Sequence, residues 1–509
     1  MVQSVKEIKR ALISVYHKDG LDEIVNILAA NGVEILSTGG TYTYLQEKSI
    51  PVTLVESVTG YPSILGGRVK TLHPKIFGGI LNRRDNPQDV TEVKEYDIPA
   101  IDLVIVDLYP FEEYVAANAS HEDIIEKIDI GGISLIRGAA KNYNDVVIIP
   151  SQESYAPLLN ILKERGCKTT LEEREFFAAQ AFMVSSHYDT AIFNYFNRKF
   201  AIPVFKESLT HGHSLRYGEN PHQKGIYFGA PETLPKQLHG KEISHNNLLD
   251  IEASIELISD FTDTTVAIIK HNNACGCASD ATLSGAWEKA LAADPVSAFG
   301  GIIVTNREID LCTAELMNKL FFEVVIAPAY SEQALEILKS KKNRIILENN
   351  LIKPTGKKFR SLLGGVLIQD RDSYVETLSD LKPVTLQQPR PDEIEDLIFA
   401  NKLVKHSKSN AIVLAKGKQL LASGIGQTSR VDSLKQAIQK AKAFNFSLEG
   451  AVMSSDAFFP FADCVEIAAA EGIKSVIQPG GSIRDNDTIE YCNKNDIAMV
   501  ITGVRHFKH

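Results

Sequence analysis

The stretch IIKHNNACGCA, residues 268–278, places a lysine, a histidine and two cysteines within eight positions. These residue types could bind a metal ion, exchange a disulfide, or catalyse proton transfer through a Lys–His pair. Cys275 and Cys277 form a C-x-C pair, and no second Cys or His pair follows at the spacing of a structural zinc site. The C-x-x-C redox spacing and the H-x-E and P-C-x-x-C elements of zinc deaminases are also absent. The pattern therefore favours Lys270 and His271, with no metal, as the residues that carry chemistry.

The run TTVAIIK, Thr264–Lys270, predicts a buried strand that is followed by a long loop. Lys270 and His271 would then lie at the carboxyl end of that strand, where ligands of α/β sheets collect. A neutral imidazole can accept a proton near pH 7, and an adjacent ammonium can stabilise a developing oxyanion. A lone histidine is more often structural, and a Schiff-base role for Lys270 stays open as an alternative.

Two loops near the N-terminus have the composition of an anion site. STGGT, Ser37–Thr41, lies where a predicted strand ends and a helix begins, so its backbone N–H groups could approach a phosphate. GGRVKTLHP, Gly66–Pro74, adds Arg68, Lys70 and Thr71. A tight turn and a solvated basic loop are the alternatives, but together the loops favour an anionic ligand.

A third segment, IDIGGISLIRGAAKN, is less informative by position alone. Asp129 precedes a Gly-Gly turn and an apolar run, which is typical of a helix cap. Lys141, near the end of the run, is typical of a surface lysine.

The elements that must position these residues alternate between strands and helices. Apolar runs at Ala11–Val15, Leu103–Tyr109 and Asp145–Pro150 predict strands of a parallel sheet covered on both faces, and Leu171 to about Arg198 predicts a long helix. Four segments are expected: a first domain at 1–200, a second at 201–370, a proline-bearing linker at 371–391 and a third domain at 392–509. The second and third share a strand–loop–helix order, which indicates a structural duplication.

Composition restricts the class of protein. The chain has 509 residues and a net charge of -10, which argues against a nucleic-acid partner. No run approaches the length of a membrane helix, the start lacks a signal-peptide pattern, and six cysteines are few for a chain of this length. We expect a cytoplasmic protein that acts on small molecules.

The motifs STGGT, GRVKTLHP, LYPF and IDIGG…RGAAKN, in this order, resemble the IMP cyclohydrolase domain of the bifunctional AICAR transformylase/IMP cyclohydrolase family. SLRYGENPHQ, KHNNACG and SAFGG resemble its transformylase domain, so the resemblance covers effectively the whole chain. It implies an α/β fold: a methylglyoxal-synthase-like parallel-sheet domain followed by two cytidine-deaminase-like α/β subdomains. It also implies a homodimer with transformylase sites at the interface.

The implied activity belongs to de novo purine biosynthesis. A formyl group passes from 10-formyltetrahydrofolate, a co-substrate, to aminoimidazole-carboxamide ribonucleotide (AICAR). Formyl-AICAR is then cyclised to IMP with loss of water, and neither step requires a metal. A regulatory ligand sensor is the alternative for the N-terminal domain; the presence of Lys70, Asp129 and Lys141 together favours catalysis.

The resemblance also implies roles for individual residues. In the cyclohydrolase, substrate would be bound by Lys18, Thr38, Gly39, Gly40, Thr41, Arg68 and Thr71, with Lys70, Tyr109, Asp129 and Lys141 as catalytic residues. In the transformylase, His271 would be the general base or proton shuttle and Lys270 its electrostatic partner. Substrate would be bound there by Arg216, Tyr217, Gly300, Glu323, Asn410 and Arg505, and folate by Arg430, Phe458 and Asp463.

The chain departs from the family pattern at two places. SVYHKDG has Tyr16 and His17 where the family commonly reads SVSDKTG, so the contacts of that loop are open. KHNNACG has Ala274 where the family has proline, so the turn could be less rigid.

Overall fold

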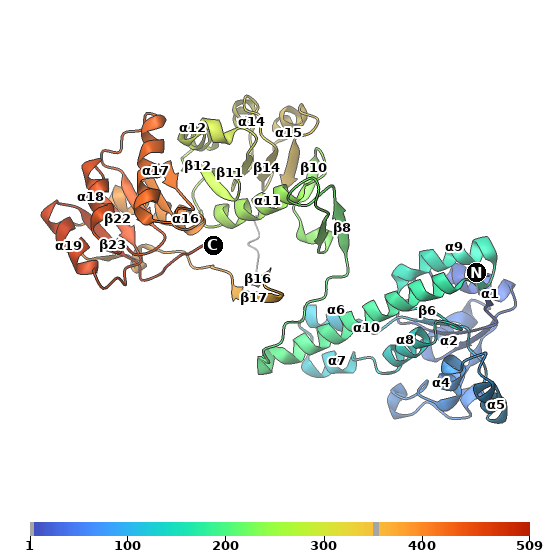
Figure 1. The fold of residues 1–509 in the computed structure, drawn as a ribbon. Coiled ribbons are helices and arrows are strands. Elements are labelled where there is room, and N and C mark those ends of the chain that lie inside the picture. The colour runs from blue at the N-terminus through green and yellow to red at the C-terminus, as the bar shows by residue number, and fades with distance from the viewer. Residues whose placement is uncertain (1–4, 350–355) are drawn as a thin grey trace. The chain divides into compact units, whose positions relative to one another are not determined.

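The computed structural model describes residues 5–349 and 356–509, and the chain divides into two compact units, Met1–Thr210 and His211–His509 (Figure 1). The division falls ten residues after the predicted end of the first domain at residue 200. The second unit contains the predicted second domain from His211 onward, the predicted linker and the predicted third domain. No helix in the described ranges has the length and apolar composition of a membrane span.

Within the described residues, the first unit is built on a five-stranded sheet in the order β4-β3-β2-β5-β6. Its strands are β2 Arg10–Ser14, β3 Glu34–Ser37, β4 Thr53–Leu54, β5 Leu103–Val106 and β6 Val147–Ile149. All neighbouring pairs are parallel. Successive strand residues face opposite sides, yet all four residues of β5 are buried, so helices cover both faces. The predicted parallel sheet is confirmed.

The helices of this unit follow the apolar periodicity of the sequence. In α1, Leu21–Ala30, the buried residues are Leu21, Ile24, Val25 and Leu28, one face of a helix. α10, Leu171–Phe200, begins with a capping box between Thr170 and Glu173. The others are α2 Gly39–Glu47, α3 Val55–Thr59, α4 Pro74–Leu81, α5 Pro87–Glu95, α6 Phe111–Ala116, α7 His121–Glu126, α8 Gly131–Lys141, α9 Tyr155–Arg165 and the 3-10 turns Leu65–Gly67 and Gln152–Ser154. A short pair, β1 Lys6–Glu7 and β7 Lys168–Thr169, completes the unit.

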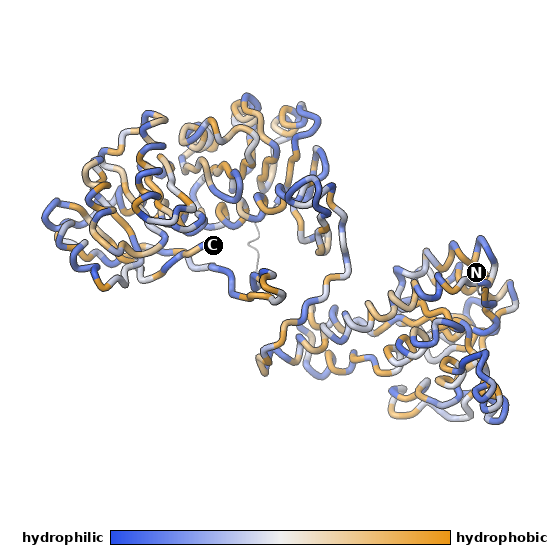
Figure 2. Tube along the Cα trace, viewed as in Figure 1, coloured by the Kyte–Doolittle hydropathy of each residue, from blue (hydrophilic) through white to orange (hydrophobic). Residues whose placement is uncertain are grey.

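In the described part of the second unit, twelve strands form one sheet, in the order β10-β15-β14-β13-β11-β12-β20-β19-β21-β22-β23-β18. The first six are β10 Lys236–His239, β11 Thr265–Lys270, β12 Asn273–Ser279, β13 Ile302–Thr305, β14 Val324–Ala327 and β15 Ile345–Glu348. The other six are β18 Lys382–Pro383, β19 Ile412–Lys416, β20 Gln419–Gly424, β21 Val452–Ser455, β22 Ser475–Gln478 and β23 Ala498–Ile501. Figure 2 shows how apolar residues concentrate along these strands.

The two halves of this sheet repeat one topology. Each has an antiparallel hairpin, a strand antiparallel to it, two further parallel strands and an antiparallel edge strand. They join where Ala278 of β12 pairs with Gln419 of β20. The expected duplication is therefore present, and β18 places part of the predicted linker in the sheet.

The helices repeat with the strands. The first half has α11 His245–Ile258, α12 Leu283–Ala293, α13 Pro295–Ala298, α14 Leu311–Met317 and α15 Glu332–Lys339. The second has α16 Pro391–Lys405, α17 Arg430–Ala443, α18 Asp463–Ala470 and α19 Asp485–Lys494. Outside the sheet lie the hairpins β8 Gly212–Leu215 with β9 Gly225–Phe228 and β16 Lys357–Leu362 with β17 Gly365–Asp370, and 3-10 turns at Pro231–Thr233 and Leu378–Asp380.

Candidate active sites

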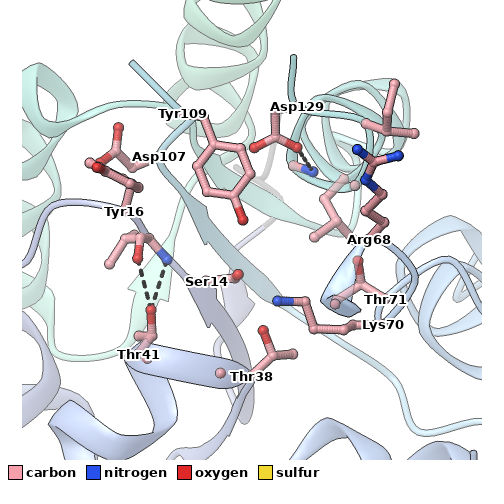
Figure 3. Close-up of a pocket in the computed structure, with 18 of the residues that line it drawn as sticks. Ser14, Tyr16, Thr38, Thr41, Arg68, Lys70, Thr71, Asp107, Tyr109 and Asp129 are labelled. Atoms are coloured by element: carbon pink, nitrogen blue, oxygen red, sulfur yellow. Dashed lines mark hydrogen bonds between the residues drawn. The ribbon is translucent and has the colours of Figure 1, made fainter. Parts of the chain in front are cut away.

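A pocket of about 620 Å³ opens at the carboxyl ends of β2, β3 and β5 in the first unit (Figure 3). Parallel strands bring the loops that follow them to one edge, which is where ligands of such sheets bind. The predicted residues that line the pocket are Lys18, Thr38, Gly39, Gly40, Thr41, Arg68, Lys70, Thr71, Tyr109 and Asp129. Five segments that are separated in sequence thus meet in one cavity.

The start of α2 forms one wall of this pocket. Within the described residues, Thr38, the N-cap, makes no side-chain capping bond, and Gly39, Gly40 and Thr41 of the first turn line the cavity. A Cβ atom on either Gly39 or Gly67 would lie 3.5 Å from Lys70 Nζ. The two glycines therefore leave room for an ammonium beside a helix N-terminus, an arrangement suited to an anion.

Thr41 and Lys18 secure the backbone around this wall. Thr41 Oγ1 accepts the Val15 N–H at 3.1 Å and donates to the Val15 carbonyl at 2.9 Å. Lys18 Nζ donates to the carbonyls of Val15 and Tyr16. Burial lowers the pKa of Lys18, and the nearby Asp107 carboxylate opposes that shift. Both side chains thus bind their own loop as well as lining the cavity.

Asp129 lies at the start of α8 on the opposite wall. The N-cap of α8 is Ile130 rather than Asp129 as predicted, but Asp129 Oδ1 still accepts the Gly132 N–H of the first turn at 2.6 Å. The Asp129 N–H donates to Tyr188 Oη at 2.8 Å. Burial raises the pKa of Asp129, while the N–H bond from Gly132 and the charge of Lys70 oppose the shift. This carboxylate therefore accepts a proton more readily than an exposed aspartate does.

Aromatic rings form a third side of the pocket. The Tyr16 ring lies edge-on to Tyr109, with centroids 5.7 Å apart. Burial raises the pKa of Tyr109, and the Asp129 charge adds to that shift. Lys127 Nζ lies 5.7 Å from the Tyr16 centroid and 5.9 Å from that of Tyr109. Tyr16, noted in the sequence only as a departure, is thus part of the wall.

Of the predicted residues, Arg68 lies at the edge of the pocket and Lys141 lies outside it. Arg68 pairs with Glu126 across the rim, and both side chains are mostly exposed. Lys141 is exposed at the last position of α8 and does not line the pocket. Eleven residues of helix span about 16 Å, so Lys141 lies far from the Asp129 end.

The second unit presents Lys270 and His271 at a tight turn between β11 and β12. Lys270 pairs with Asn273, and the intervening His271 and Asn272 have φ values of 52° and 63°. Positive φ at both central residues is the signature of a type I′ hairpin turn. The predicted position of Lys270 and His271 at a strand end is confirmed. The predicted long loop is wrong, because NACGCAS forms β12.

The side chains of this turn separate into exposed and buried sets. His271 is exposed, and Lys270 Nζ donates to the Phe299 carbonyl at 2.6 Å. Cys275 and Cys277 are buried in β12, where burial raises the pKa of Cys275 to about 12 and also raises that of Cys277. In residues 5–349 and 356–509, no group of three His, Cys, Asp or Glu side chains is placed to hold a metal ion.

A chain of hydrogen bonds links the turn to the second half of the sheet. Asn273 Oδ1 accepts the Lys408 N–H at 3.0 Å, two residues before Asn410. Asn410 Oδ1 accepts from Arg430 Nη2 at 2.9 Å, and Arg430 also pairs with Asp456. Arg430 is only 9% exposed, so it contacts Asn410 and the core rather than open solvent.

A family model described as AICARFT/IMPCHase bienzyme matches residues 139–440, which is more than half of the chain.

The chain belongs to the AICARFT/IMPCHase bienzyme family.

A model of the MGS-like domain matches residues 20–134 of the same chain. A protein of Bacteroides thetaiotaomicron named "Bifunctional purine biosynthesis protein PurH" is 63% identical over 504 residues, covering 99% of each chain. Proteins of the same name from Acetivibrio thermocellus and Persephonella marina are 48% and 46% identical, covering 99% and 98% of this chain and 100% of theirs.

Membership of the AICARFT/IMPCHase family confirms the predicted fold class and both activities. The chain is a formyltransferase and an IMP cyclohydrolase of purine biosynthesis. Its MGS-like match falls on the unit that holds the pocket of Figure 3. A formyltransferase of this family uses a folate-type formyl donor.

The remaining residues predicted for the AICARFT/IMPCHase transferase site lie on several elements. Gly300, with φ 71°, follows the Phe299 carbonyl that binds Lys270, and Glu323 pairs with Lys241 at 3.3 Å. The Arg216 guanidinium donates to Tyr217 Oη, and the Arg505 guanidinium lies over the Phe507 ring. Phe458 is 36% exposed, and Asp463 is the first residue of α18.

Sequence reasoning missed two acidic residues of the pocket, Asp107 and Glu126. Asp107 Oδ2 accepts the His17 N–H and contacts His17 Nδ1, each at 2.8 Å. Its position directly after β5 was an available signal, because carboxyl ends of parallel strands converge. Glu126 could not be predicted in this way, since its partner Arg68 is 58 positions away in the sequence.

Proposed function

We propose that the pocket of the first unit closes formyl-AICAR to IMP and that the His271 turn transfers the formyl group from 10-formyltetrahydrofolate to AICAR. The observation that carries the first assignment is the meeting of Lys70, Tyr109 and Asp129 in one cavity. The second rests on an exposed imidazole beside an ammonium at a strand end.

In the cyclohydrolase pocket, the start of α2 and Lys70 suit the phosphate-bearing substrate. The first-turn N–H groups of α2 supply donors and a partial positive charge for an anion. Thr38, Gly39 and Gly40 supply that backbone, and Arg68 adds charge at the rim.

Ring closure needs one proton acceptor and one donor. The carboxamide nitrogen attacks the formyl carbon, a C–N bond forms, and the formyl oxygen becomes negative. Asp129, whose pKa burial raises, accepts the nitrogen's proton. Tyr109 and Lys70 stabilise the negative oxygen and protonate it to a hydroxyl. A second proton then converts this hydroxyl to water, the C–O bond breaks, and the former 5-amino nitrogen releases its proton as its double bond to the formyl carbon forms.

Formyl transfer needs a base because the 5-amino group of AICAR is a weak nucleophile. As its nitrogen bonds to the formyl carbon, His271 accepts the amine proton. The Lys270 ammonium stabilises the oxyanion, the bond from the formyl carbon to folate N10 breaks, and N10 takes up a proton. Asn410, fixed by Arg430, would hold the carboxamide near the imidazole.

The folate and the remaining AICAR contacts follow the family motifs. Arg216, Tyr217, Gly300, Glu323 and Arg505 are assigned to AICAR. Phe458, Asp463 and Arg430 are assigned to folate, where an aromatic ring and a carboxylate suit a pterin. The buried bond of Arg430 to Asn410 supports an indirect role for that arginine.

A cytoplasmic homodimer is the proposed state of the protein. Hairpin β16–β17 supports self-association because Leu363 is 101% exposed and Leu367 60%. Figure 2 shows apolar residues along this hairpin, and an exposed apolar strand pair is a typical interaction surface.

Two variants of the full chain test the assignment of the two sites. Lys70→Met should lower cyclisation at least about 100-fold and leave formyl transfer intact, since it removes one stabilising charge. His271→Ala should do the reverse. Lys75→Met, which removes a lysine paired with Asp97 outside the pocket, is the matched control. Loss of both activities in either variant would contradict the assignment.

A further inference from the structure

We propose that Asp250 of α11 is a positioning residue that holds the His271 turn in the conformation needed for formyl transfer. This inference rests on the proposed role of His271. Asp250 does not touch the reacting atoms; it acts through the backbone of the turn.

The turn needs an external support because of its backbone conformation. His271 and Asn272 both lie in the left-handed region, with φ 52° and 63°. Residues with a Cβ atom rarely adopt this region, although asparagine and histidine do so more often than most. Such conformations persist only where surrounding contacts determine them. Among residues 5–349 and 356–509, the exposed imidazole of His271 makes no hydrogen bond that could hold the turn.

Asp250 supplies the support from the helix beneath the turn. Its Oδ1 accepts the Asn272 N–H at 2.6 Å, a backbone group that the hairpin ladder does not use. Burial raises the pKa of Asp250, while the Asn272 N–H bond and the His271 charge oppose the shift. The carboxylate is therefore directed at the turn from a partly desolvated position.

The second half of the sheet contains the same device. Asp396 of α16 accepts the Gly417 N–H at 2.7 Å and the Lys418 N–H at 2.6 Å. Gly417 and Lys418 form the β19–β20 turn, with φ 59° and 53°. Thus each half has an aspartate on the helix before the hairpin that binds the N–H groups of a left-handed turn.

The two turns differ in the side chains that they present. The first carries an imidazole, whereas the second carries glycine and a lysine paired with Asp263 at 3.0 Å. Because the contact occurs at both turns, the aspartate binds the turn backbone whatever side chain the turn carries. Only the turn that carries His271 is relevant to formyl transfer. Asp396 is accordingly a matched control within the same chain.

Loss of Asp250 should displace the imidazole without removing it. A misplacement of about 1 Å can lower a rate about 100-fold. We expect Asp250→Ala to lower kcat for formyl transfer about 30- to 100-fold, with a smaller change in KM. Asp250→Asn should keep at least about a third of the wild-type kcat, since its amide oxygen can accept the same N–H bond.

The experiment measures formyl transfer and cyclisation by Asp250→Ala, Asp250→Asn and Asp396→Ala in the full chain. Asp396→Ala should leave formyl transfer near the wild-type rate, and all three should keep cyclisation. Adding Asn272→Gly to Asp250→Ala should recover activity, because glycine adopts positive φ without strain.

Three results would overturn the inference: full formyl transfer by Asp250→Ala, equal losses in Asp250→Asn and Asp250→Ala, or an equal loss in Asp396→Ala. Asp250→Asn keeps the test valid if the alanine variant folds poorly. Failure of the proposed function is distinguished separately, since His271→Ala would then retain formyl transfer.

Discussion

Gly132 is the residue whose lack of a side chain leaves room for the Asp129 carboxylate. A Cβ atom at this position would lie 2.7 Å from Asp129 Oδ2 and 3.0 Å from its Cγ. The same residue donates its N–H to Oδ1 at 2.6 Å. Orientation of the proposed proton acceptor therefore depends on a glycine at the second position of α8.

Gly132→Ala should consequently impair ring closure. We expect cyclisation to fall about 100-fold because the carboxylate must move, with a stability loss of about 1–3 kcal/mol from overpacking. Gly138→Ala in the same helix is the control, since its nearest contact would be an ordinary 3.5 Å from Phe77. Steady-state assays of both activities and thermal melts provide the comparison; unchanged cyclisation in Gly132→Ala would contradict this geometry.

At the residue scale, sequence identifies groups more readily than their partners. Lys70 and Asp129 stand in motifs, and the structure brings both to the pocket. The bond from Arg430 to Asn410 joins the start of α17 to the segment before β19, 20 positions apart, and no local pattern encodes it. Lys141 shows the converse, since its motif is clear while the structure places it at the far end of α8.

At the scale of elements, His506 ties the C-terminal tail to segment 371–376. Its Nδ1 lies 2.6 Å from Asp372 Oδ2 and its Nε2 lies 2.8 Å from Glu376 Oε1. Burial lowers the pKa of His506, but the two carboxylate bonds outweigh it and raise the pKa to about 9. The imidazolium is therefore the folded-state form at neutral pH.

This shift predicts a pH dependence of stability. The pKa is raised on folding, so the contribution is complete below pH 6.5 and is lost as pH rises through about 9. The full shift corresponds to at most about 3 kcal/mol of unfolding free energy. His506→Gln should remove this pH dependence, whereas His213→Gln, at an exposed pair with Glu242, should not.

Urea unfolding between pH 6 and 9.5, followed by fluorescence, gives the measurement. The single tryptophan, Trp287, is buried in α12 and reports on the second unit. Parallel pH profiles for wild type and His506→Gln would exclude the proposed tether.

Element prediction succeeded where the pattern was strong. The apolar run TTVAIIK predicted β11, and Leu171 to about Arg198 predicted α10. β12 was missed because NACGCAS is rich in small residues of low strand propensity. Its pairing with β11 and β20, not its local preference, makes this segment a strand, and Cys277 and Ala278 are fully buried there.

At the scale of the whole molecule, the duplicated sheet organises the second unit. The strand order could not be predicted from the sequence, because it depends on pairs as distant as Ala278 with Gln419. The repeated strand–loop–helix order nevertheless indicated the duplication. In sequence, hairpin β16–β17 lies between the two halves of this repeat, and several of its apolar side chains are exposed.

Charging that hairpin should separate the proposed dimer. Leu363→Glu with Leu367→Glu should yield monomers in sedimentation experiments, because each charge would be desolvated at an interface. Formyl transfer should fall while cyclisation persists. Val90→Glu on α5 of the first unit, also at an exposed apolar position, is the control. A dimeric double variant, or a monomeric wild type, would contradict the proposal.

In the proposed mechanism, two separate sites on one chain act in succession. The most direct measurement supplies AICAR and 10-formyltetrahydrofolate to wild type, Lys70→Met, His271→Ala and an equal mixture of the two variants. Wild type should form IMP, Lys70→Met should accumulate formyl-AICAR, and His271→Ala should form neither. The mixture should restore IMP formation, since formyl-AICAR released by one variant can be cyclised by the other. Formation of IMP by either variant alone at the wild-type rate, or no IMP from the mixture, would contradict the account.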